Sequence, residues 1–153
     1  MNIEQLGYLG FNATDPGAFG HYATDTLGMQ QVDLGTGRPA FRIDSHQQRV
    51  IVEPSESNGA AYVGWQVADS AALQAAGAEL EAAGVAVHDA TGEELEVRRV
   101  ADMLHFLDPA GHRVELYCAA AQAAEPFTSP RDIPAFVAEE LGLGHCVLTT
   151  RDL

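Results

Sequence analysis

Polar and apolar residues alternate along the first third of the chain in a way that predicts a strand, a short helix and three further strands. The run LGYLGFNATD (residues 6–15) predicts a strand that ends where Asp15 can cap a helix and Pro16 can take its first position. Residues 16–27 place apolar side chains at helical spacing, and Gly28 offers a left-handed stop. The three strands are predicted at MQQVDL (29–34), AFRID (40–44) and RVIVE (49–53). This order is a βαβββ unit.

The same order of elements is predicted a second time. AYVGWQVAD (61–69) is an apolar run that ends in Asp69, and an alanine-rich helix closed by Gly84 follows it. Four strands are predicted after this helix, at VAVHD (85–89), ELEVRRV (94–100), MLHFLD (103–108) and HRVELY (112–117). Tyr8 precedes Asp15 by seven residues, and Tyr62 precedes Asp69 by seven. The repeat predicts an α+β domain of tandem βαβββ modules over residues 1–118, divided at about 1–57 and 58–118.

The chain then makes a third start. A connector (119–140) leads to LGHCVLTTRD, in which His145 precedes Asp152 by seven residues. A strand without partner strands cannot bury its apolar face. We therefore expect residues 141–153 to be the first strand of a C-terminal domain that lies outside this sequence.

Composition narrows the classes of partner. Apolar residues make up 46% of the 153 residues, which suits a globular domain, and the net charge of −14 would repel nucleic acid and anionic membranes. No stretch resembles a signal peptide or approaches the roughly 20 apolar residues of a membrane span. These features predict a cytoplasmic protein with no membrane partner, in which Cys118 and Cys146 remain thiols.

Five segments carry a resemblance to a known family. They are LGYLGF (6–11), FRIDS (41–45), GWQVAD (64–69), DPAGHRVELY (108–117) and GLGH (142–145). In them the chain resembles the N-terminal half of the type I extradiol (catechol meta-cleavage) dioxygenases. These enzymes belong to the vicinal oxygen chelate, or glyoxalase and bleomycin resistance, superfamily. The resemblance implies curved mixed sheets with flanking helices, and cleavage of a catechol such as 2,3-dihydroxybiphenyl by O₂ in a homo-oligomer.

The resemblance also implies a metal. Members of the family bind Fe(II), occasionally Mn(II), through two histidines and a glutamate of their C-terminal domain. His145 matches the first of these ligands. The other ligands and the acid–base residues would lie beyond Leu153, so we expect no catalytic residue, no cofactor-binding residue and no bound metal in this chain alone.

When the two modules of this chain are compared with such a metal site, Tyr8 and Tyr62 stand at its two histidine positions. Glu115 stands at its glutamate position. A neutral phenol is a poor ligand for a divalent ion. We therefore expect a metal-free N-terminal domain.

The remaining histidines and cysteines favour structural roles. His112 and Glu115 are an odd number of residues apart in a strand and should face opposite sides, as should His145 and Cys146. His105 is predicted to be a hydrogen-bonded strand residue. We expect His21 and His46 to be solvated, and we identify no partner for His88.

Two other functions stay open. The chain could be a stand-alone, metal-free protein that binds an aromatic compound on the surfaces of Tyr8, Tyr62 and Trp65. A glyoxalase-type lyase or isomerase is the least favoured, because tyrosines stand at both histidine positions.

Overall fold

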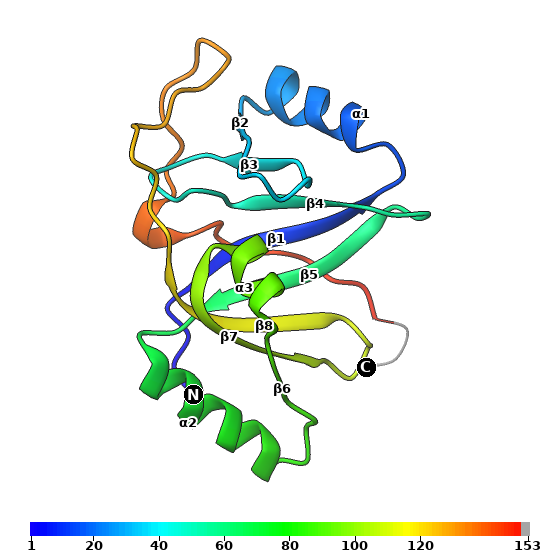
Figure 1. Cartoon of the computed structure of the whole chain (residues 1–153), viewed down its shortest axis with the longest axis vertical. Helices are drawn as coiled ribbons and strands as arrows, with labels where there is room; N and C mark the ends of the chain where they lie inside the picture. The colour runs from blue at the N-terminus through cyan, green and yellow to red at the C-terminus, as the bar shows by residue number, and fades with distance from the viewer. Residues whose placement is uncertain (151–153) are drawn as a thin grey trace.

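The computed structural model describes residues 1–150 and places eight strands in one mixed sheet (Figure 1). The strands are β1 (Gln5–Ala13), β2 (Gln30–Val32), β3 (Ala40–Arg42), β4 (Val50–Pro54), β5 (Gly59–Gln66), β6 (His88–Asp89), β7 (Val100–Leu107) and β8 (Arg113–Ala120). The α-helices are α1 (Pro16–His21), α2 (Ser70–Ala82) and α3 (Gly92–Arg98). Two short helical turns complete the elements, the π-helical turn η1 (Tyr22–Thr26) and the 3₁₀ turn η2 (Glu139–Leu141). None of the described helices is long and apolar enough to cross a membrane.

The strand order confirms the predicted α+β fold of repeated βαβββ order. The sheet runs β2-β3-β4-β1-β5-β8-β7-β6, so each module contributes one half, and the two halves repeat the same order from the centre outwards. The first strand of each module pairs in parallel with the last one, β1 with β4 and β5 with β8. β1 and β5 pair antiparallel and join the modules.

The helix caps read from the sequence are confirmed. Asp15 Oδ1 accepts a hydrogen bond from Ala18 N at 2.9 Å, and Asp69 Oδ1 accepts one from Ala72 N at 2.8 Å. The predicted helix 16–27 is α-helical only to His21 and continues as η1. Within this stretch Thr24 Oγ1 donates to the carbonyl of Gly20, and such back-bonding competes with regular helix.

The predicted strand at 94–100 is wrong, because most of this segment forms α3. A capping box begins the helix: Thr91 Oγ1 accepts from Glu94 N at 3.2 Å, and Glu94 Oε2 accepts from Thr91 N at 2.8 Å. Arg99 ends it in the left-handed conformation, with φ of 55°. The alternating apolar positions suit a strand and a two-turn helix equally well, and the local cap decides for the helix.

Three buried clusters hold the elements together. One lies between the sheet and α3, a second lies under α2, and a third lies under α1. The α3 cluster contains three of the four tyrosines, Tyr8, Tyr62 and Tyr117. In Figure 1, α3 lies over the middle of the sheet, whereas α2 lies at one end.

The connector runs back along the first module. It bonds to the loop between β3 and β4, with Gln47 N donating to Ala121 O and Ala123 N donating to Ser45 O. The predicted strand after it is absent from the described residues 142–150. β1 is paired on both sides, so this segment cannot join the sheet beside it. Asp152 lies outside the described residues, and the assignment of 141–153 to a further domain stays a prediction.

Candidate functional site

Two tyrosines face each other across the central strand pair. Tyr8 on β1 is paired with Gly64, and Tyr62 on β5 is paired with Gly10. Each ring covers the glycine opposite: a Cβ at Gly64 would lie 2.3 Å from the Tyr8 ring, and one at Gly10 would lie 2.1 Å from the Tyr62 ring. The ring centroids are 6.1 Å apart at an interplanar angle of 79°. The repeat thus brings together the two positions that sequence analysis compared with metal-binding histidines.

Glu115 completes this group from β8. Its side chain has no exposed surface, and its Oε2 accepts a hydrogen bond of 2.7 Å from Tyr8 Oη. β8 pairs with β5 in the register Gly64 to Glu115, so the carboxylate projects beside the Tyr8 ring. Tyr8, Tyr62 and Glu115 therefore share one buried site, as the repeat predicts.

The cation at this site is a side chain, Arg98, which sequence analysis missed. Its Nε and Nη2 each donate to Glu115 at 3.0 Å in a bidentate pair, and its Nη1 lies 3.3 Å from Glu53 Oε1. The guanidinium carbon lies 3.6 Å from the centroid of the Tyr62 ring, a cation–π contact. Arg98 is the last residue of α3 and is 7% exposed. The capping-box motif TGEE (91–94) was the signal in the sequence that could have placed it there.

Further ion pairs surround Arg98. Arg113 Nε donates to Glu115 Oε1 at 2.8 Å, and Arg113 Nη2 donates to Glu94 Oε1 at 2.6 Å. Arg38 Nε donates to Glu53 Oε2 at 2.6 Å, and Tyr62 Oη donates to the other oxygen of Glu53 at 2.9 Å. Arg38 Nη2 also lies 3.4 Å from Glu93 Oε1, so four carboxylates meet three guanidinium groups.

These residues do not fit a divalent metal ion. The Glu115 carboxylate is already engaged by two arginines and by Tyr8. A metal here would lie against the Arg98 guanidinium, and the phenols of Tyr8 and Tyr62 are poor ligands. The arrangement joins β1, β5, β8 and α3 through a hydrogen bond, a cation–π contact and ion pairs, and these contacts leave no open coordination position at Glu115.

The tyrosines show how strongly this site is shielded from water. Burial and the neighbouring Glu115 carboxylate raise the pKa of Tyr8 well above its usual range. Burial also raises the pKa of Tyr62, and it raises the pKa of Tyr117 to about 12. For Glu94, burial alone would raise the pKa, but hydrogen bonds from Thr91 and Arg113 outweigh it and lower the pKa to about 2.

We expect the free energy of unfolding to fall above about pH 10, the usual pKa of tyrosine in an unfolded chain. There the unfolded chain ionises, while Tyr8, Tyr62 and Tyr117 stay neutral in the fold, so the stability that these groups contribute is lost as the pH rises. Each contributes a slope of up to about 1.4 kcal/mol per pH unit. No lysine titrates in this range, because all eight basic side chains are arginines.

Urea unfolding between pH 9 and pH 11 measures this slope. Tyr8→Phe should make it shallower, whereas Tyr22→Phe, at a residue 54% exposed, should leave it as in the parent protein. If the unfolding free energy falls with pH equally steeply in the parent and in Tyr8→Phe, Tyr8 does not have a raised pKa in the fold.

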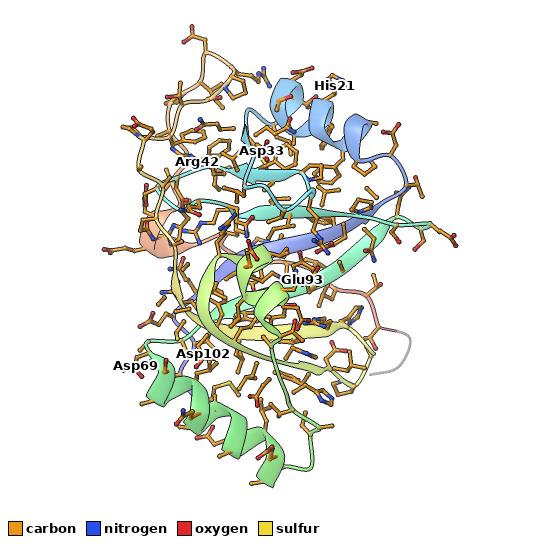
Figure 2. The ribbon with its side chains drawn as sticks, viewed as in Figure 1. His21, Asp33, Arg42, Asp69, Glu93 and Asp102 are labelled. Atoms are coloured by element: carbon orange, nitrogen blue, oxygen red, sulfur yellow. The ribbon has the colours of Figure 1, made fainter. Side chains whose placement is uncertain are left out.

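The structure places the other sequence-selected residues outside this network, except His105, which pairs with Glu115 across β7 and β8. His145 is exposed and follows Leu143, whose N donates to Leu6 O at 2.8 Å. His105 lies on β7, where its ring packs 5.3 Å from that of His88. His112 Nδ1 lies 3.0 Å from Asp108 Oδ2 in the turn before β8. Figure 2 shows His21 on α1, well separated from Glu93 on α3.

The two cysteines are free thiols. Cys118 is buried, and Cys146 is half-buried. The aromatic side chains considered for ligand binding do not form an open surface: Tyr8 is 2% exposed and Tyr62 is 4% exposed, and Trp65 packs in the α2 cluster on the other face of the sheet.

Comparison with known proteins relates the chain to one group of enzymes. The family model described as dihydroxybiphenyl dioxygenase BphC D1 matches residues 6–55. The chain is 36% identical over 154 residues to 3-methylcatechol 2,3-dioxygenase of Pseudomonas putida, covering 100% of this chain and 53% of that protein. It is 37% identical to the iron-dependent extradiol dioxygenase of Rhodococcus jostii, covering 99% of this chain and 51% of that protein.

A solved structure agrees with these sequence matches. A crystal structure of catechol 2,3-dioxygenase superposes with a TM-score of 0.93 at 31% identity, over 99% of this chain and 55% of that one. The chain therefore spans about half the length of the relatives that it matches. By sequence and by fold, it is a homologue of the extradiol dioxygenases of the vicinal oxygen chelate superfamily over about half of their length.

Proposed function

We propose that the chain is the N-terminal part of an extradiol dioxygenase that opens the ring of a catechol with O₂, and that His145 is the first protein ligand of its metal. The observation that carries the proposal is the presentation of His145. Leu143 N is bonded to Leu6 O, and a Cβ at Gly142 would lie only 2.4 Å from the same carbonyl. The backbone is thus docked against β1, and the imidazole emerges exposed two residues later.

The names of the relatives support the substrate and the metal. Two of them are named for 3-methylcatechol and biphenyl-2,3-diol, and a third is named as iron-dependent. On this proposal the metal is Fe(II), with Mn(II) as the alternative. Its chemistry is to hold the catechol and O₂ side by side.

His145 alone does not make a metal site. Within residues 1–150, one group of three potential ligand side chains comes together, and it does not include His145. The proposal therefore assigns the remaining ligands to a following domain. The described domain then has an architectural role, in which the Arg98 network gives it a rigid core and β1 positions the segment that carries His145.

A chimera tests this proposal. Residues 1–153 are joined to the C-terminal half of the Pseudomonas putida 3-methylcatechol 2,3-dioxygenase, loaded with Fe(II) without air and assayed for ring cleavage of 3-methylcatechol. We expect cleavage by the chimera and none by residues 1–153 alone. His145→Ala should lose both the iron and the cleavage activity, because a facial metal site needs all of its protein ligands.

The matched control is His21→Ala, which removes another exposed histidine from α1 and should keep both properties. A His145→Ala chimera that binds iron and cleaves the substrate like its parent would refute the assignment of His145.

A further inference from the structure

Three side chains that can each offer a ligand atom come together away from the Arg98 network. Asp44 and His46 lie in the loop after β3, and Glu139 lies in η2 of the connector. Their ligand atoms all lie within 4.8 Å of one another. His46 Nδ1 lies 3.3 Å from Asp44 Oδ1. Neighbouring ligand atoms of a tetrahedral zinc ion are also about 3.3 Å apart, given bonds of about 2.0–2.1 Å.

The ring atom Nδ1 of His46 lies beside Asp44 but makes no hydrogen bond to the described residues. This atom is buried. The side chain as a whole is 12% exposed. A buried polar atom left unpaired costs about 1–3 kcal/mol, so such atoms normally have a partner. A cation between the imidazole and the carboxylates would supply one.

The two carboxylates are held in place and keep lone pairs free. Asp44 Oδ2 accepts from Arg49 at 2.6 and 2.8 Å and from Glu139 N at 3.1 Å, whereas Oδ1 accepts from His46 N at 3.1 Å. Glu139 accepts from the backbone N and the hydroxyl of Ser45. Hydrogen bonds of this kind orient metal ligands. Two carboxylates beside one guanidinium leave a formal charge of −1, so a divalent cation is not repelled by the group.

We propose that Asp44, His46 and Glu139 form a binding site for a divalent cation of the zinc type. One imidazole nitrogen and two carboxylate oxygens are ligands that zinc accepts. The cation would fasten the connector to the loop after β3. Since Glu139 precedes His145 by six residues, it would also steady the backbone that presents His145. The site stands on its own geometry and does not depend on the proposed dioxygenase function.

Zinc titration of the chelator-treated chain by isothermal calorimetry tests the proposal. All variants carry His88→Ala, because the adjacent rings of His88 and His105 could bind zinc as well. We expect one zinc ion per chain, a rise in the melting temperature at saturation, and slower proteolysis of the connector. His46→Ala should weaken binding by more than the roughly 10–100-fold that follows loss of an outer hydrogen-bond partner.

Glu139→Gln provides a second variant on an exposed residue, and it should also weaken binding even where His46→Ala fails to fold. His21→Ala, at a side chain 85% exposed, is the control and should bind zinc like its parent. The proposal is overturned if zinc neither binds nor stabilises the parent chain. It is equally overturned if Glu139→Gln and a folded His46→Ala bind zinc as tightly as the parent does.

Discussion

Replacing Arg98 with methionine is expected to lower the free energy of unfolding by about 3–5 kcal/mol, the usual cost of breaking a buried ion pair from one side. The substitution keeps much of the side-chain volume but removes the bidentate partner of Glu115, a carboxylate with no exposed surface. It also removes the cation–π contact with Tyr62 and the hydrogen bond to Glu53.

Urea unfolding at pH 7 measures the loss of unfolding free energy in Arg98→Met, and three further variants serve for comparison. Arg131→Met makes the same change at an exposed arginine and should cost less than about 1 kcal/mol. Arg98→Lys keeps the charge without the planar fork and should fall between the parent and Arg98→Met. Adding Glu115→Met to Arg98→Met should restore part of the stability, because no carboxylate then remains unpaired. A loss below about 1 kcal/mol for Arg98→Met would mean that Arg113 and Tyr8 alone hold Glu115.

The Arg98 network shows which parts of a site the sequence can reveal. Tyr8 and Tyr62 hold equivalent positions in the repeat, and Glu115 takes the glutamate position of the metal site with which the repeat was compared. Arg98 has no such equivalence. Its position follows only if residues 92–98 are known to be helical. The sequence hides this helix, because Leu95 and Val97 alternate with polar residues as they would in a strand. The decision rests on two hydrogen bonds of the capping box, a local signal that outweighs the apolar pattern in so short an element.

The fold was predictable where the cause is local and unpredictable where it needs a distant partner. The caps at Asp15 and Asp69 act on the next three residues, and both were predicted. The state of residues 142–150 depends instead on whether a sheet edge is free. β1 has no free edge, so an apolar run that suits a strand stays irregular here. The proposed cation site also depends on residues that are far apart in the sequence, since Glu139 reaches Asp44 only through the path of the connector.

Arg49→Met is the second substitution with a large expected effect, again about 3–5 kcal/mol of unfolding free energy. Arg49 has no exposed surface, and its guanidinium joins three parts of the chain. It donates twice to Asp44, once to the carbonyl of Glu139 in η2 at 2.8 Å, and on β1 once to the carbonyl of Gly7 at 2.8 Å and once to Gln5 Oε1 at 3.2 Å. Its removal therefore unpairs a buried carboxylate and loosens the connector.

Arg42→Met is the matched control for this change. Arg42 is also buried, at 3% exposed, but within the described chain its guanidinium makes one hydrogen bond, to Glu125 O, and no ion pair. Its loss leaves no charge unpaired, so the cost should be smaller, at about 1–3 kcal/mol. Equal costs for Arg42→Met and Arg49→Met would show that packing, and not the Asp44 charge, accounts for the loss.

The pH dependence separates the charge of Asp44 from the packing of Arg49. Burial alone would raise the pKa of Asp44, but the contacts of this carboxylate with His46 and Arg49 outweigh burial, so the pKa lies well below its usual range. A lowered carboxyl pKa contributes stability above the unfolded value of about 3.9, and this contribution is lost as the pH falls through the folded value. Arg49→Met removes most of that contribution at pH 7, so the difference between the parent and the variant should narrow from pH 7 to pH 3. If urea unfolding gives the same difference at both pH values, the stabilisation by Arg49 does not come from the Asp44 charge, and its hydrogen bonds to Gly7 and Glu139 are the stronger cause.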